Sequence, residues 1–104
     1  MTFDFKDKVV LITGAGSGLG YACAVAFANA GAKVAITDIS QNVLDKAIVA
    51  LRDTGTEVLG LLNDASDSGD VNILLDAIIT RFGRLDIAVN NAGTATPLQE
   101  FHEV

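Results

Sequence analysis

The sequence has little of several residues that carry structure or chemistry in other small proteins. Its 104 residues include one cysteine, one histidine, one proline and no tryptophan. A single cysteine, Cys23, excludes an intrachain disulfide and any cysteine-based metal cluster, so we expect no metal site. A lone cysteine also fits a reducing compartment, and we expect a cytoplasmic protein. His102 lies near the end of the chain, in Glu100-Phe101-His102-Glu103, and is interpreted as a surface side chain.

Long apolar runs and an excess of positive charge are also missing. No apolar run approaches the roughly 20 residues that a membrane-spanning helix needs. The first residues include Asp4 and Asp7 and show no secretory signal. Seven Lys and Arg residues stand against thirteen Asp and Glu, which gives a formal net charge of −6. Binding to nucleic acid phosphates needs the opposite balance, so we expect neither a membrane nor a nucleic acid as partner.

What the sequence does contain is an alternation of two kinds of segment. Short runs rich in Val, Ile and Leu have the length and composition of strands that are buried on both faces. These runs are residues 9–13, 34–37, 58–62 and 85–89. The stretches between them carry apolar residues three and four positions apart, as helices with one buried face do. The expected buried faces are Leu19, Ala22, Cys23, Ala26, Phe27 and Ala30, then Leu44, Ala47, Ile48 and Leu51, then Val71, Leu74, Leu75, Ile78, Ile79 and Phe82.

Serine and glycine mark where these helices begin and end. Ser40 is placed to cap the second helix, because its hydroxyl can accept a hydrogen bond from a free N–H of the first turn. Gly31, Gly55 and Gly83 follow the three helices, where glycine commonly ends a helix. Regular alternation predicts an α/β fold with one domain over residues 1–104, built as a doubly wound parallel sheet with helices on both faces.

A glycine-rich loop follows the first expected strand directly. It reads Thr13-Gly14-Ala15-Gly16-Ser17-Gly18-Leu19-Gly20, and a helix is expected to begin inside it. Glycines there let the backbone turn sharply and approach a pyrophosphate, whose charge the free N–H groups of the helix N-terminus stabilise. Leu19 stands where the last glycine of a strict G-x-G-x-x-G pattern would fall, so the loop is T-G-x-x-x-G-x-G. An ordinary tight turn is the weaker alternative.

This octad, together with Asn90-Asn91-Ala92-Gly93 after the fourth strand, resembles the short-chain dehydrogenase/reductase family. The resemblance covers almost the whole chain but only the first half of the family's usual length. It implies a Rossmann-type sheet with strand order 3-2-1-4, which is half of the full family fold. The resemblance further implies that the chain is the NAD(H)-binding part of an oxidoreductase that acts on an alcohol or ketone. It also implies that Asn91, Ala92 and Gly93 pass the cofactor ribose, while Asn90 ties the fourth strand to its neighbours.

The end of the second strand indicates NAD rather than NADP. Asp38, close to 20 residues after Gly20, can accept hydrogen bonds from the adenosine ribose and would repel a 2′-phosphate. No Lys or Arg stands in the glycine loop or just after Asp38. Capping of the next helix is an alternative task for Asp38, for which Ser40 competes. Ile39 is expected to lie against the adenine.

After the third strand the sequence leaves two readings open. In the family, the position of Asp64 in Asn63-Asp64-Ala65 meets the adenine amino group. A solvated loop at a helix N-terminus has the same composition, and we weigh the two equally. The complete set of expected cofactor-binding residues is Gly14, Ser17, Gly18, Leu19, Gly20, Asp38, Ile39, Asp64, Ala65, Asn91, Ala92 and Gly93.

The family's catalytic residues are not expected in this chain. In the family, a Tyr gives the proton to the carbonyl and a Lys four residues later lowers its pKa. The single tyrosine, Tyr21, is followed four residues later by Val25, so we expect no catalytic residue, no substrate pocket and a chain truncated before both. The alternative function is a stand-alone NAD-binding or NAD-responsive module without turnover. A domain that keeps the fold without binding a nucleotide is the weakest hypothesis, because the glycine loop and Asp38 are intact.

The fourth strand is also expected to mediate association. Without a fifth strand it would stand at an edge of the sheet, with unpaired N–H and C=O groups and no Pro or Lys to discourage pairing. Apolar faces beside it would be open as well. We therefore expect a homodimer through the fourth strand or these faces, which only Asp86 opposes by its charge.

Overall fold

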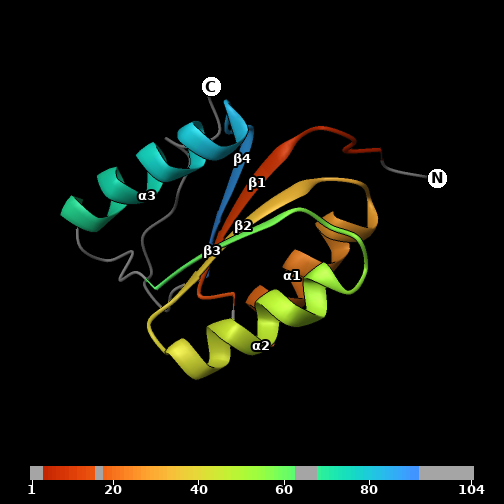
Figure 1. Cartoon of the computed structure of the whole chain (residues 1–104), viewed down its shortest axis with the longest axis horizontal. Helices are drawn as coiled ribbons and strands as arrows, with labels where there is room; N and C mark the ends of the chain where they lie inside the picture. Colours follow the sequence, from red (N-terminus) through yellow and green to blue (C-terminus); the bar gives the residue numbers. More distant parts are fainter. Residues whose placement is uncertain (1–3, 16–17, 63–67, 92–104) are drawn as a thin grey trace.

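The computed structural model describes residues 4–15, 18–62 and 68–91, with residues 68–70 described by their backbone alone. Strands and helices alternate through these residues, as the sequence predicts (Figure 1). The strands are β1 (Val9–Thr13), β2 (Lys33–Asp38), β3 (Val58–Leu62) and β4 (Ile87–Asn90). The helices are α1 (Gly18–Asn29), α2 (Gln41–Arg52) and α3 (Ser68–Phe82). Strands β1 and β3 have the expected bounds, while the ends of β2 and β4 differ from the expected ones by one or two residues, which is common for strand boundaries.

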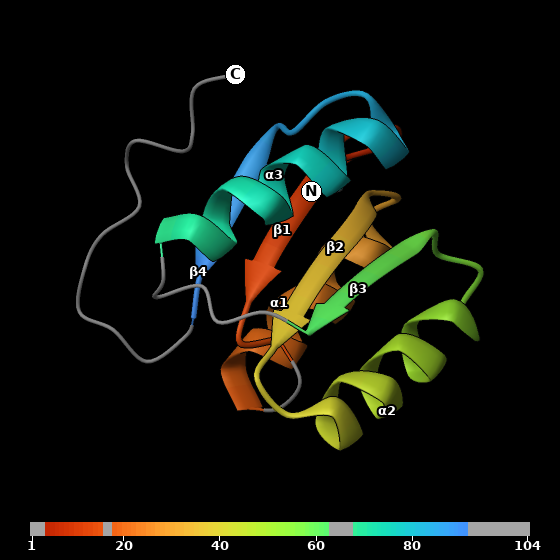
Figure 2. The ribbon, with the colours of Figure 1, turned by 60° about the vertical axis from the view of Figure 1, so that its left-hand side comes forward.

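The four strands form one parallel sheet in the order β3-β2-β1-β4. Figure 2 shows the strands side by side in this order. The predicted Rossmann-type order is thereby confirmed. Strand β2 is placed next to β1 on one side, and the chain later returns to place β4 next to β1 on the other side. The carboxyl ends of β1 and β4 therefore border a point where the strand order reverses, which is where such sheets bind ligands.

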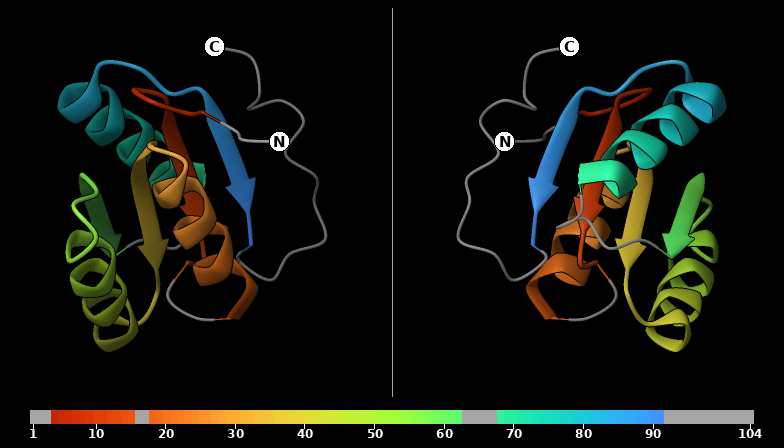
Figure 3. Two further views of the ribbon diagram at one scale, coloured as in Figure 1. Left: turned by 90° about the vertical axis from the view of Figure 1, so that its right-hand side faces the viewer. Right: turned by 90° about the vertical axis from the view of Figure 1, so that its left-hand side faces the viewer.

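The sheet separates two hydrophobic layers. One layer packs Val10, Ile12, Val34 and Ile36 against α1 and α2, while the other packs Val9, Leu11 and Ala35 against α3. Figures 1 and 3 show α1 and α2 on one face of the sheet and α3 on the other. Side chains of one strand alternate between the layers because successive residues of a strand point to opposite faces.

The expected helix ends are found in the structure. The Ser40 hydroxyl accepts a hydrogen bond from the Val43 N–H at 3.5 Å and caps α2. Glycines follow all three helices, and their N–H groups close the last turns by donating to carbonyls of the helices: Gly31 to Ala28, Gly55 to Arg52 and Gly83 to Ile79.

The expected buried face is confirmed for α2 and needs correction in α1 and α3. In α1, Leu19, Ala22 and Ala26 are exposed, whereas Gly20 and Ala24 are buried. This helix is small and apolar on most sides, so apolar spacing alone does not identify its buried side. In α3, Leu74 and Ile78 are buried as expected, but Ile79 is 48% exposed because it lies at the margin of the contact with the sheet.

Strand β4 pairs with β1 and with no further strand among the described residues. The expected role of Asp86 needs correction, because its carboxylate does not project as an isolated charge. It accepts hydrogen bonds from the Val9 N–H at 2.8 Å and from Arg84, with which it also forms an ion pair at 2.6 Å. Asp86 therefore continues the pairing of β4 with β1 rather than opposing contact at the free edge.

The described part of the chain has neither a membrane-spanning helix nor a cluster of metal-binding side chains. None of its helices is long and apolar enough to cross a membrane. It also brings together no group of three or more His, Cys, Asp or Glu side chains that could hold a metal ion.

Candidate cofactor site

The glycine loop begins at the carboxyl end of β1 and leads into α1. Gly14 has φ +63°, a backbone conformation that glycine adopts without the steric cost paid by other residues. The Ala15 N–H donates to the Thr37 carbonyl at 2.9 Å, so the loop is fixed to the end of β2. Helix α1 starts at Gly18, within the loop, as expected. A helix N-terminus is thus presented at the carboxyl edge of the sheet, where its N–H groups favour an anion.

Gly20 brings three parts of the expected site into contact. A Cβ added at this residue would stand 2.6 Å from Nδ2 of Asn91 and would overlap the Gly14 carbonyl oxygen. The Asn91 side chain in turn donates to that carbonyl at 3.4 Å. The first turn of α1 therefore lies directly on the loops that follow β1 and β4, which only a residue without a side chain permits.

Thr13 joins the ends of β1 and β4 through its hydroxyl. The hydroxyl donates to Oδ1 of Asn90 at 2.9 Å and accepts from the Asn91 N–H at 3.0 Å. The Asn91 N–H is also 3.2 Å from the Thr13 carbonyl. These contacts agree with the structural task expected of Asn90. The role of Thr13 was not predicted from the sequence, although a hydroxyl at the end of β1 and two amides at the end of β4 were a signal that they could meet.

Asp38 ends β2 beside the start of α2. Its carboxylate accepts the Ser40 N–H at 3.0 Å, while the Ser40 hydroxyl caps the helix. Of the two tasks considered for Asp38, capping therefore belongs to Ser40. The local turn holds the Asp38 carboxylate at the carboxyl edge of the sheet, which is the position that contact with a ribose requires.

Large apolar side chains are exposed at this same edge. Ile39 is 75% exposed, Leu19 is 70% exposed and Leu62 is 55% exposed. They lie just after β2, near the start of α1 and at the end of β3, respectively. Exposed apolar groups beside a polar, glycine-rich loop suit the flat face of a nucleotide base.

Of the predicted cofactor-binding residues, the structure places Gly14, Gly18, Leu19, Gly20, Asp38, Ile39 and Asn91 at the carboxyl edge of the sheet. It brings Gly14, Gly20 and Asn91 into mutual contact. Ser17, Asp64, Ala65, Ala92 and Gly93 lie outside the described residues, as does His102.

The ionic contacts described by the structure lie at the opposite, amino edge of the sheet. Lys33 and Glu57 approach to 3.7 Å, and Arg84 pairs with Asp86. Burial alone would raise the pKa of Asp86, but hydrogen bonds from Arg84 and the Val9 N–H outweigh burial and hold this pKa below its usual value. In turn, the hydrogen bond to Asp86 is the main cause that raises the pKa of the Arg84 guanidinium.

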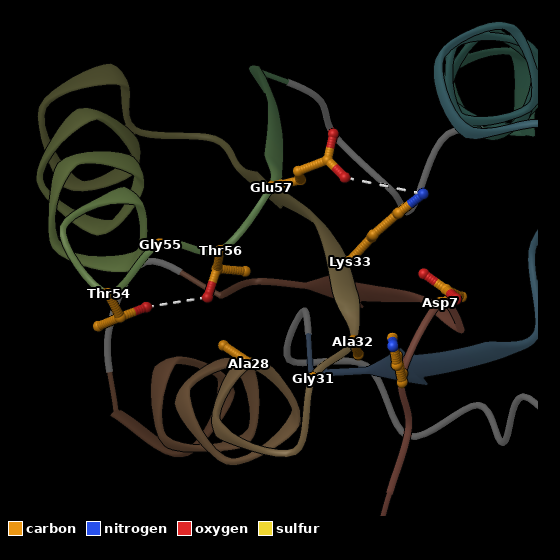
Figure 4. Close-up of a pocket in the computed structure, with 10 residues that line it drawn as sticks. Asp7, Ala28, Gly31, Ala32, Lys33, Thr54, Gly55, Thr56 and Glu57 are labelled. Carbon is orange, nitrogen blue, oxygen red and sulfur yellow. Dashed lines mark hydrogen bonds and ion pairs between the residues drawn. The ribbon is translucent and has the colours of Figure 1, made fainter.

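A crevice of about 390 Å³ also opens at the amino edge, between the ends of α1 and α2. Figure 4 shows Lys33 and Glu57 along one side and the hydroxyls of Thr54 and Thr56, 2.8 Å apart, along the other. The Thr54 hydroxyl donates to the Leu51 carbonyl at 2.7 Å, so it accepts from Thr56. These polar side chains of the crevice therefore pair with one another. The crevice lies at the opposite edge of the sheet from the glycine loop.

Comparison with known proteins agrees with this arrangement. The family model for short chain dehydrogenases matches residues 8–104. A short chain dehydrogenase/reductase of Aspergillus oryzae is 42% identical over 105 residues, which is 97% of this chain and 40% of that protein. Levodione reductase of Leifsonia aquatica is 46% identical over 94 residues, or 88% of this chain and 35% of that protein.

Solved structures lead to the same family. A 2-keto-3-deoxy-D-gluconate dehydrogenase from Streptococcus agalactiae superposes with a TM-score of 0.80 at 42% identity, over 95% of this chain and 38% of that one. A short chain dehydrogenase from Burkholderia phymatum in complex with NAD gives a TM-score of 0.79 at 38% identity, over 84% and 31% of the two chains. The chain thus spans at most about two fifths of these relatives. On the family match and these likenesses, the chain belongs to the short chain dehydrogenase family.

Proposed function

We propose that this chain forms the NAD(H)-binding part of an oxidoreductase that interconverts an alcohol and a ketone. The observation that carries the proposal is the geometry of the carboxyl edge. Gly14, Gly20 and Asn91 meet there, and the adjacent strand presents Asp38 and the exposed Ile39. The cofactor, when bound, would supply or accept the hydride.

The described residues fit a dinucleotide in three respects. Gly18 and Leu19, the first residues of α1, are exposed, so the helix N-terminus offers N–H groups to a pyrophosphate. Asp38, held by the Ser40 N–H, is placed to accept hydrogen bonds from the ribose, and Ile39 offers an apolar surface to the adenine. We extend the site to Ser17, Gly18 and Leu19 in the loop, and to Asp64, Ala65, Ala92 and Gly93 on the strength of the sequence.

NAD is preferred over NADP in this proposal. A carboxylate at the ribose position repels a 2′-phosphate, and the described residues around Asp38 offer no Lys or Arg to pair with one. Titration calorimetry with each nucleotide tests the preference directly. We expect measurable affinity for NAD and at least tenfold weaker affinity for NADP, and equal or tighter binding of NADP would overturn the assignment.

A second candidate is an NAD-binding module without turnover. It is favoured by the environment of Tyr21, which lies in the first turn of α1 and packs partly buried against the hydrophobic layer between α1, α2 and the sheet. In this chain no Lys follows it at the spacing that lowers a tyrosine pKa. We expect the 104 residues alone to bind NAD and to oxidise no NADH with any ketone. Robust turnover by this chain would refute the proposal that its residues lack the catalytic set.

We also propose that the chain alone forms a homodimer through β4 or the faces beside it. In support, β4 is paired on one side among the described residues, and Asp86 is engaged with Arg84 and β1. An edge of this kind offers unpaired backbone groups to a second strand. Light scattering across micromolar concentrations is the test. A monomer at every concentration would show that the edge is protected.

A further inference from the structure

A row of side chains crosses the sheet just below the carboxyl edge. Thr37 lies opposite Leu61 on β3, and Thr13 lies opposite Asn90 on β4. Thr13 and Thr37 each follow the paired residues Ile12 and Ile36, which face α1 and α2. Because side chains alternate along strands, both threonines point to the α3 face. Three polar side chains therefore stand next to one another on neighbouring strands.

The two threonines differ in their hydrogen bonds. Thr13 is 4% exposed, and its hydroxyl contacts Asn90 and the Asn91 N–H. Thr37 is 1% exposed, and its hydroxyl has no hydrogen-bond partner in the part of the chain that the structure describes. Buried hydroxyls are paired in most proteins because leaving one unpaired costs roughly 1–3 kcal/mol. The Thr37 hydroxyl is thus exceptional, and a hydrogen-bond partner for it is expected.

We propose that Thr37 and Thr13 hold an internal water molecule between β2 and β1. Neighbouring strands lie about 4.8 Å apart, and two hydrogen bonds of about 2.8 Å through one water oxygen span that gap. Water suits the site because it can accept from the Thr37 hydroxyl and donate to the Thr13 oxygen. Buried waters of this kind commonly satisfy otherwise unpaired polar groups.

The water would make the polar row continuous across three strands. Thr13 already links β1 to Asn90 and Asn91, and the water adds Thr37, which precedes Asp38. The strand that carries Asp38 would then be tied to the strands that carry Gly14 and Asn91. This inference does not depend on which nucleotide binds, so its test stands apart from that of the proposed function.

The substitution Thr37→Val tests the water site because it keeps the shape of the side chain and removes the hydroxyl. The measurement uses the whole protein that contains this sequence. If the hydroxyl holds a water, the variant leaves that water with too few partners, and Tm falls by about 4 °C. If the hydroxyl is simply unpaired, the valine removes a desolvation cost and Tm stays the same or rises. The second result overturns the proposal.

A double-mutant cycle with Thr13→Val supplies an independent measurement. The structure shows no direct hydrogen bond between the two hydroxyls, and a bridging water would couple the two substitutions. We expect the folded-to-unfolded ratio to depart from additivity by a factor of about 5. Thr37→Val combined with Thr56→Val, at the far edge of the sheet, serves as the control and is expected to be additive. Additivity of Thr37→Val with Thr13→Val refutes the bridge.

A crystal structure settles the matter if either variant fails to fold. The parent protein is expected to show one ordered water within hydrogen-bonding distance of both threonine oxygens. A structure that resolves ordered waters elsewhere in the core and shows none there would overturn the proposal.

Discussion

The two edges of the sheet use polar residues in different ways. At the amino edge, side chains satisfy one another: Lys33 approaches Glu57, Arg84 pairs with Asp86, and Thr56 donates to Thr54. At the carboxyl edge, side chains mainly hold the backbone in place. Asn91 donates to the Gly14 carbonyl and Asp38 accepts the Ser40 N–H.

One sheet thus keeps residues that stabilise the fold apart from residues that can bind a ligand. Contacts among side chains at the amino edge leave little for a ligand to bind. Contacts between side chains and backbone at the carboxyl edge fix the loops while a helix N-terminus and exposed apolar groups remain available. Substitutions at the amino edge should therefore change stability alone, whereas those at the carboxyl edge should change nucleotide binding.

The largest expected effect contrasts a glycine from each edge. Gly20→Ala forces its Cβ against the Gly14 carbonyl and Asn91, so the loop must move. We expect NAD affinity, measured by calorimetry, to fall by about 100-fold. In Gly55→Ala, the Cβ meets open space at φ +85°, and we expect a loss of roughly 1–2 kcal/mol in unfolding free energy with unchanged affinity. Equal NAD affinity of the Gly20 variant and the parent would break the contrast.

Charge reversal gives the next largest effect. Asp38→Arg removes the carboxylate beside the proposed ribose and supplies a donor for a 2′-phosphate, so the ratio of NADP to NAD affinity should rise by about 100-fold. The control is Asp53→Arg at the exposed end of α2, which is expected to leave the ratio unchanged. The same ratio in parent and Asp38 variant would remove Asp38 from the site.

At the amino edge, Asp86 should make stability depend on pH. Its pKa is lowered in the folded protein, so its contribution is present above the unfolded value of about 3.9 and is lost as pH falls through the lower folded value. In urea unfolding at pH 7, Asp86→Asn should lose about 1 kcal/mol, and this difference should shrink as pH falls below the unfolded pKa of about 3.9. Asp76→Asn, at an exposed position on α3, should differ little from the parent at either pH. A loss in the Asp86 variant that is independent of pH would contradict the ionic contribution.

The smallest expected effect is a gain in stability. Asp7 has φ +66° in the turn where Lys8 N–H donates to the Phe5 carbonyl at 2.8 Å. Asp7→Gly relieves this conformation and should raise the unfolding free energy by about 0.5–1 kcal/mol, without a change in nucleotide affinity. Asp53→Gly, at φ −62°, has no such conformation to relieve and should be destabilising. Thermal unfolding of both variants tests the opposite signs.

The sequence predicted well those features that depend on residues close together in the chain. Ser40 caps α2 because its hydroxyl reaches its own first turn, and β1 and β3 begin and end where their apolar runs do. The placement of Asp38 and Gly14 at one edge also followed from strand order, since carboxyl ends of parallel strands lie together. Much of the candidate site was thereby predicted from the chain itself.

Residues whose environment depends on distant partners were predicted less well. Leu19 was expected to be buried with α1, but the packing of Gly20 on the loops turns Leu19 outward. Asp86 was expected to repel a second strand, yet the N–H that it accepts belongs to Val9, far away in the sequence. The sequence also gives no sign that the Thr37 hydroxyl lacks a hydrogen-bond partner among the described residues, because threonine is common in strands and its contacts can be assessed only in three dimensions.

Gly60, in the middle of β3, sets the distance between two layers of the molecule. A Cβ at this residue would overlap Cδ1 of Ile48 on α2 and would stand 3.6 Å from Cδ1 of Leu44. A larger residue at position 60 would therefore lift α2 from the sheet, or force Ile48 into another rotamer. Ser40 caps α2 and its N–H holds the Asp38 carboxylate, so this lift would also shift the proposed ribose contact. A substitution at position 60, outside the proposed nucleotide site, can thus change the nucleotide preference through the packing of α2 on the sheet.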